Sequence, residues 1–291
     1  MTRTTDRRRF LAAGASAALV GLSGCTGATP FVGKRLEETH EFDVGDGNSL
    51  AIDADNGDVT VRSGSPRLET VKKSGSVFAD LSDASVDVGR DGDTVRVEAR
   101  TDDDGSWFQG TPAVDVTADI PDGVTVDAVR TRNGDADVRG VTGDATVESR
   151  NGDAVARNVD GEVTVQTDNG DAEARGISGY VTAQTENGDA VARNVGGLDG
   201  ASSENGDVDV EIPSVRGDTS VETDNGDVEA AVSPDVDARL VLRTDRGDVS
   251  IDGPFDVATR TDEYAEAGPE DADAELRLRS DNGDVSVTAL D

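Results

Sequence analysis

The 291-residue chain has very little of the side-chain chemistry on which many enzymes depend. His40 is its only histidine and Cys25 its only cysteine, so a histidine relay has almost no material and no intramolecular disulfide can form. Carboxylates that could hydrolyse a glycoside are plentiful, but among 61 acidic residues no pair stands out. We therefore expect a protein that is not an enzyme, with a carbohydrate-active enzyme as the alternative.

Positive charge is scarce as well. The chain has 27 Lys and Arg residues against 61 Asp and Glu, a formal net charge of −34. Because the acidic residues alternate with Val, Ala and Ile, they predict a folded surface and not a disordered acidic tail. This charge makes nucleic acid and anionic lipid surfaces poor partners. It is typical of proteins adapted to high salt, where a Debye length of about 3 Å at 1 M screens the self-repulsion.

Long apolar runs are also missing, apart from one near the N-terminus. The stretch 12–22 is apolar except for a few Gly and Ser residues, and it is too short for the roughly 20 residues that span a bilayer. It follows Arg7-Arg8 and Phe10-Leu11, which resemble a twin-arginine export motif. These features predict a signal peptide over 1–24.

The residues after the apolar stretch, Leu22-Ser23-Gly24-Cys25, resemble a lipobox. Cleavage there would leave Cys25 as the first residue, with its sulfur carrying a lipid. Since a single acyl chain binds membranes only marginally, firm anchoring requires two chains. We expect a tether over 25–44 and a mature protein that is held at the outside of the cytoplasmic membrane, on the cell surface. With its acidic composition, the chain resembles a haloarchaeal secreted lipoprotein.

The most regular feature of the chain is a repeat with a period of 18 residues. Five Asn-Gly-Asp triplets mark it, beginning at Asn133, Asn151, Asn169, Asn187 and Asn205. The same turn recurs at Asn56, Asn225 and Asn282, and as Arg-Gly-Asp at Arg246. A constant period of this kind indicates a repeat architecture.

Each repeat contains two short stretches in which apolar and polar residues alternate, as in a strand with one buried face. Glycine takes positive φ freely and Asn tolerates the left-handed region, so the triplet predicts a turn between the strands. An antiparallel meander has the same turn signal, but it does not need identical unit lengths. We therefore predict an all-β fold, a β-solenoid of two-strand coils over 131–291.

The flanks of the repeats are less regular. Residues 45–130 contain irregular strands and are expected to form an N-terminal β module that caps the stack, since the end of a solenoid must not present a bare strand edge. An acidic insertion over 261–273 is expected to loop out between the last two coils.

The aspartates of the triplets raise the question of a metal site. Stacked coils would align them in a file of hard oxygen ligands that suit Ca²⁺. A simpler interpretation, which we favour, is that they cap the turns. The candidate metal ligands are Asp135, Asp153, Asp171, Asp189 and Asp207.

Two other motifs have simpler explanations than ligand binding. Arg-Gly-Asp occurs at Arg216 and Arg246, but Arg246 stands where the turn Asn stands elsewhere. Trp107-Phe108 is the only aromatic pair and is expected to cap the core, with an exposed contact tip or sugar platform as the alternative.

Residues 114–124, together with the stretch from Val129 to Asp135, resemble the putative adhesin family, a domain of unknown function (DUF4097). The likeness covers roughly residues 45 to 289. It implies a β-solenoid-like domain on exported or envelope proteins and no established activity.

These observations favour a non-enzymatic, lipid-anchored structural or adhesive module whose partner is a cell-surface glycoprotein or polysaccharide. The alternative is a calcium- or carbohydrate-binding envelope module, which would require a saturable small ligand. No cofactor is expected, with Ca²⁺ on the aspartate file as the alternative, and the only expected membrane contact is through the N-terminal lipid.

Overall fold

The structure is a computed structural model that describes residues 33–76, 80–101, 111–269 and 271–290. The predicted signal peptide with its lipobox, Cys25 and the Trp107-Phe108 pair lie outside these residues. Within the described ranges, no helix is long and apolar enough to cross a membrane.

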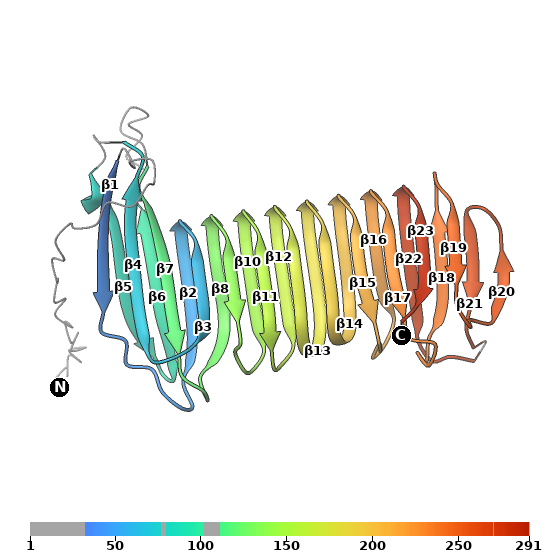
Figure 1. Ribbon diagram of the computed structural model, residues 1–291, viewed down its shortest axis with the longest axis horizontal. Helices are drawn as coiled ribbons and strands as arrows, with labels where there is room; N and C mark the ends of the chain where they lie inside the picture. The colour runs from blue at the N-terminus through green and yellow to red at the C-terminus, as the bar shows by residue number, and fades with distance from the viewer. Residues whose placement is uncertain (1–32, 77–79, 102–110, 270, 291) are drawn as a thin grey trace, which may run out of the picture.

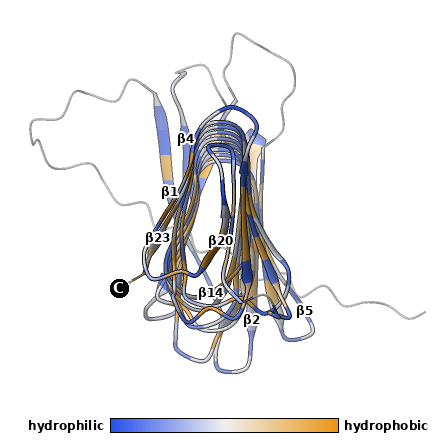
Figure 2. Cartoon of the chain, turned by 90° about the vertical axis from the view of Figure 1, so that its right-hand side faces the viewer, coloured by the Kyte–Doolittle hydropathy of each residue, from blue (hydrophilic) through white to orange (hydrophobic). Residues whose placement is uncertain are grey.

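The strands stack into one elongated body, in which they run across the long axis (Figure 1). Each coil contributes one strand to each of two facing sheets. Seen along the long axis, the coils superimpose as a narrow ring whose two long sides are the sheets (Figure 2). Their inward residues form one continuous apolar core of mostly Val and Ala, with Leu and Ile added in some coils. Because the interior is narrow, the chain fills it with few aromatic residues.

The strand order within each sheet follows from the pairing. Sheet 1 consists, in spatial order, of β5 (Ala84–Asp91), β6 (Thr94–Thr101), β2 (Ser49–Asn56), β8 (Thr125–Asn133), β10 (Ala145–Asn151), β12 (Val163–Asn169), the second halves of β13 (Ala172–Asn187) and β14 (Ala190–Asn205), β16 (Thr219–Asn225), β22 (Glu275–Asn282), β18 (Arg239–Thr244), β21 (Tyr264–Ala267) and β20 (Val257–Arg260).

Sheet 2 consists of the opposite strand of each coil. Its order is β1 (Lys34–His40), β4 (Arg67–Ser74), β7 (Ala113–Ile120), β3 (Val59–Ser63), β9 (Ala136–Arg139), β11 (Ala154–Val159), the first halves of β13 and β14, β15 (Val208–Ile212), β17 (Val228–Val232), β23 (Val285–Ala289) and β19 (Val249–Asp252). A short 3-10 helix, η1 (Leu81–Asp83), precedes β5.

Successive repeats pair in parallel and in register. In sheet 1, Val147 lies opposite Val165, which lies opposite Ala183 on the next coil. In sheet 2, Ala154 lies opposite Ala172 in the same way. An antiparallel meander would place neighbouring strands in opposite directions, so the predicted β-solenoid is confirmed.

The stack also extends beyond the repeats that the period identified. Asn56 at the end of β2 pairs in register with Asn133, and Val59 of β3 pairs with Ala136. The coil made by β2 and β3 is therefore part of the regular ladder, although it lies within 45–130, the range expected to form an irregular N-terminal cap.

The spatial order of the coils differs from their order in the chain at both ends. The β2–β3 coil lies between the β6–β7 coil and the β8–β9 coil, and the last coil, β22–β23, lies between β16–β17 and β18–β19. The antiparallel strands β20 and β21 follow β18 at the C-terminal end of sheet 1. The expectation that 261–273 loops out is wrong, because β21 pairs with β18 and its Ala265 and Ala267 are buried there.

The single histidine lies at the opposite end of the stack. His40 of β1 is half-buried, and its Nε2 is 2.8 Å from Oγ1 of the buried Thr70. Desolvation by burial lowers its pKa below the ordinary value of 6.5, Glu38 opposes this shift, and Lys72 adds to it. The folded state therefore binds this proton less readily than the unfolded state.

This lowered pKa gives a prediction with a definite sign. The contribution of His40 to the free energy of unfolding is complete above about pH 6.5 and decreases as the pH falls through the pKa of the unfolded state. Chemical denaturation at pH 7.5 and 5.5 in molar KCl measures this loss of stability. The variant His40→Gln should have a smaller pH dependence over this interval, and an unchanged dependence would contradict the assignment.

Candidate functional site

The Asn-Gly-Asp corner is a ladder of repeated hydrogen bonds that runs along one edge of the stack. The amide of Asn187 donates to the side-chain oxygen of Asn169 at 3.1 Å, and the same contact recurs from coil to coil. The backbone N–H of Gly170 donates to the carbonyl of Asn187 at 2.8 Å. The hydroxyl of Thr185 donates to the carbonyl of Gly170 at 2.9 Å. The triplet thus supplies side-chain and backbone partners at every turn.

The five aspartates proposed as metal ligands do form one file on this edge. In each coil, the backbone N–H of the aspartate donates to Oδ1 of the aspartate before it, at 2.9 Å for Asp153 on Asp135 and for Asp171 on Asp153. Asp189 and Asp207 continue the pattern. Within the described residues no three His, Cys, Asp or Glu side chains group as metal ligands do. The geometry supports the capping role, and calcium binding stays a prediction.

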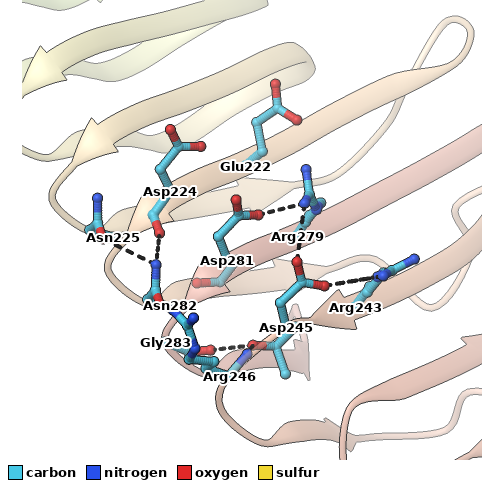
Figure 3. Close-up of polar contacts among 12 residues, drawn as sticks. Glu222, Asp224, Asn225, Arg243, Asp245, Arg246, Arg279, Asp281, Asn282 and Gly283 are labelled. Carbon is cyan, nitrogen blue, oxygen red and sulfur yellow. Dashed lines mark hydrogen bonds and ion pairs between the residues drawn. The ribbon is translucent and has the colours of Figure 1, made fainter.

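A second acidic row lies on the outer surface of sheet 1, one residue before each turn Asn from Asn169 onward and before Arg246. We call it the acidic row; its members are Asp168, Glu186, Glu204, Asp224, Asp281 and Asp245. Arg279 pairs with Asp281 at 2.6 Å, and Arg243 with Asp245 at 3.1 Å (Figure 3). Among the described residues, the ion pairs of this row involve Asp168, Asp245 and Asp281 and do not include Glu186, Glu204 or Asp224.

A polar groove of about 530 Å³ lies on sheet 1 near its N-terminal end. Its walls are arginines and carboxylates that pair with one another, such as Arg130 with Glu148 at 2.8 Å and Arg132 with Asp55 at 3.1 Å. The remaining charged residues of the lining are Asp53, Arg96, Glu98, Arg100, Arg150 and Asp168. Because these charges balance and no aromatic residue lines the groove, it offers polar contacts and no stacking surface.

Both Arg-Gly-Asp tripeptides are used within the fold. The guanidinium of Arg216 lies 4.5 Å from the centre of the Tyr180 ring and pairs with Glu162 and Asp199. Hydrogen bonds to these two carboxylates raise its pKa further above its ordinary range. Arg246 donates to Oδ1 of Asn282 and so continues the asparagine ladder. Neither tripeptide has the exposed, unpaired arginine that a contact motif needs.

Sheet 2 carries a feature that the sequence reasoning missed. Five arginines lie in register on successive coils, each directly after a buried residue and pointing outward. We call them the arginine file: Arg62, Arg139, Arg157, Arg175 and Arg193. Their recurrence at an interval of 18 residues from Arg139 onward was a visible signal. It was overlooked because the alternation was used only to separate buried from exposed positions.

The family model described as Toastrack DUF4097 matches residues 47–288, which is most of the chain. The chain belongs to the DUF4097 family. The match includes the β2–β3 coil and the returning coil β22–β23 almost to its end. Among curated proteins, none matches the chain.

Several solved bacterial structures match this DUF4097 chain at low sequence identity. A crystal structure of a putative adhesin from Bacteroides fragilis is 14% identical with a TM-score of 0.46, over 88% of this chain and 97% of the other. A putative adhesin from Parabacteroides distasonis is 11% identical with a TM-score of 0.40, over 88% and 98%. A putative lipid binding protein from the same species is 8% identical with a TM-score of 0.39, over 86% and 96%.

Proposed function

We propose that this DUF4097 protein is a non-enzymatic, lipid-anchored surface module that holds a glycoprotein or polysaccharide along the outer face of a sheet. The observation that carries the proposal is the uninterrupted stack. Parallel strand pairs continue from β6 to β18 in sheet 1 and from β7 to β19 in sheet 2. Such a body has long, regular outer faces and extends a tethered chain away from its anchor.

The outer faces of the sheets favour an extended partner that contacts many coils over a small ligand in a deep pocket. Typical small-molecule sites are enclosed and mostly apolar, whereas the groove on sheet 1 is lined by paired charges. Carbohydrate binding in that groove is the alternative function, because it presents many hydrogen-bonding groups in a small volume.

The anchor is tested by the variant Cys25→Ser expressed as the full chain. We expect the wild-type protein to sediment with the membrane fraction and to be released by detergent, because lipid on Cys25 is its predicted membrane attachment. The variant should move to the soluble fraction or the medium. The control Ser23→Ala keeps a small residue in the lipobox and should remain with the membrane. A variant that stays with membranes as firmly as the wild type would contradict the anchor.

The binding role is tested by sedimenting the purified mature protein with isolated envelopes in molar KCl. The proposal expects saturable co-sedimentation that soluble envelope polysaccharide or glycoprotein competes away. A protein that remains in the supernatant, or whose binding is not saturable, would contradict the proposal.

A further inference from the structure

The arginine file is an unusual concentration of one charge in an acidic molecule. Parallel register places the backbone of each arginine one strand spacing, about 4.8 Å, from the next. Like charges directly opposite each other on neighbouring strands destabilise a sheet. In a chain with a net charge of −34, acidic residues are frequent enough to alternate with arginines at these positions. The file therefore has a cost in stability that a purely structural surface would not need.

The carboxylates that balance the file lie beside it on the same outer face of sheet 2. Each pairs with one or more of the arginines: Asp119, Asp137, Glu173 and Asp209. The side chains of Asp119, Asp137 and Glu173 are only 14–19% exposed, whereas the arginines are 35–54% exposed. The arginine side chains are therefore more accessible to a partner on sheet 2 than the carboxylates that balance them.

The arginines also keep hydrogen-bonding capacity. Alternate coils carry Val155 and Val191 at the outward position where their neighbours carry an acid, so five arginines share four carboxylates. Arg175 contacts Glu173 through Nε, at 3.0 Å to an oxygen that Arg157 also uses. A guanidinium has five N–H donors in a planar fork, so the terminal nitrogens of Arg175 remain available to an oxyanion.

We infer that the arginine file is a docking surface for a linear acidic polysaccharide, whose carboxylate or sulfate groups the guanidinium forks bind. This inference rests on the proposed function and specifies the chemistry of its partner. Planar forks suit bidentate recognition of oxyanions. Because the groups lie in a straight line at a constant spacing, a polymer engages several of them at once and gains affinity from each additional contact.

High salt and the local surface favour this occupant over nucleic acid. With a Debye length of about 3 Å at 1 M, a polymer on sheet 2 interacts with the charges that it touches and not with the distant acids. Nucleic-acid channels combine positive charge with aromatic residues on which bases stack. The outward positions beside the file are Thr60, Asp137, Val155, Glu173 and Val191, none of which is aromatic.

The test is the affinity of the full mature chain for fluorescent dextran sulfate, measured by anisotropy in molar KCl. The double variant Arg175→Gln/Arg193→Gln should bind about tenfold more weakly, a loss of ~1.4 kcal/mol. The matched control is Arg243→Gln/Arg279→Gln, which removes the same charge from exposed arginines of sheet 1 and should bind like the wild type. Thermal unfolding of each variant verifies that it is folded.

A second test uses a variant that is expected to strengthen dextran sulfate binding, together with its control. Glu173→Gln removes the carboxylate that holds Arg157 and Arg175, so it should strengthen binding several-fold. Glu275→Gln is its control, because Glu275 is equally exposed at 19% and also holds two arginines, Arg239 and Arg277, but on sheet 1. If the arginine file has only a structural role, Glu173→Gln should not strengthen dextran sulfate binding.

The outcomes separate this inference from the proposed function. Equal losses in the two arginine double variants would overturn the inference, as would equal gains in the two glutamate variants. Saturable envelope binding without dextran sulfate binding would overturn the inference and leave the proposed function in place. Tighter binding of single-stranded DNA than of dextran sulfate through the same arginines would overturn the choice of occupant.

Discussion

Replacing Gly188 by alanine is expected to lower the free energy of unfolding by about 4 kcal/mol or more. Gly188 has a φ of +142°, which side-chain-bearing residues rarely adopt. A Cβ built there would lie 2.1 Å from the carbonyl oxygen of Gly170 on the neighbouring coil. That oxygen accepts the hydroxyl of Thr185, so the turn cannot move away without losing hydrogen bonds. Backbone strain of roughly 1–3 kcal/mol adds to hydrogen bonds of roughly 0.5–1.5 kcal/mol each.

The measurement is thermal and urea unfolding in molar KCl. A loss of this size corresponds to a melting temperature lower by roughly 10 °C for a domain of this length. Gly217→Ala is the matched control, because a Cβ there meets nothing within 4 Å and its φ is not in the positive range. It should change stability by no more than ~0.5 kcal/mol. Similar effects of the two substitutions would contradict the close packing of the turns.

Transfer from molar to millimolar salt is expected to destabilise the protein by a comparable amount. The net charge of −34 repels itself when the Debye length grows from about 3 Å at 1 M to about 30 Å at 0.01 M. The acidic row concentrates this repulsion, since Glu186, Glu204 and Asp224 follow one another on successive coils near 4.8 Å apart. We expect the melting temperature to fall by roughly 10 °C or more, which is a loss of several kcal/mol.

Variants of the acidic row test whether charge repulsion causes the loss of stability at low salt. Glu204→Gln should recover part of the lost stability at low salt and change little at high salt, because it removes a charge that only its like neighbours surround. Asp281→Asn is the control from the same row, where Arg279 compensates the carboxylate at 2.6 Å, and it should give no recovery. Sucrose in place of KCl should not restore the melting temperature. Full recovery in sucrose would show that screening is not the cause.

Much of the architecture follows from local chemistry that repeats along the chain. Three local signals predicted the same two-strand coil. They are the interval of 18 residues, the Gly of each triplet, which takes positive φ freely, and the alternation of Val and Ala with polar residues. Parallel register then stacked the residues of each column, as for Val147, Val165 and Ala183. The turn-capping role of the aspartates was also predicted, but the N–H that each one caps belongs to the next coil, as for the N–H of Asp171 on Oδ1 of Asp153.

The order of the coils was decided by the tertiary structure alone. Strand pairing depends on which edges meet in space, and nothing in the 18-residue pattern says that β22–β23 returns to lie between β16–β17 and β18–β19. The same holds for β21, which lies in the acidic segment expected to loop out but pairs with β18, where its Ala265 and Ala267 are buried. The sequence by itself determined the coil, its turns and which residues face inward, since these depend on neighbours along the chain. The pairing of the arginine file with carboxylates beside it depended on the fold as well, because it joins residues from different coils, such as Arg157 with Glu173 and Arg62 with Asp119.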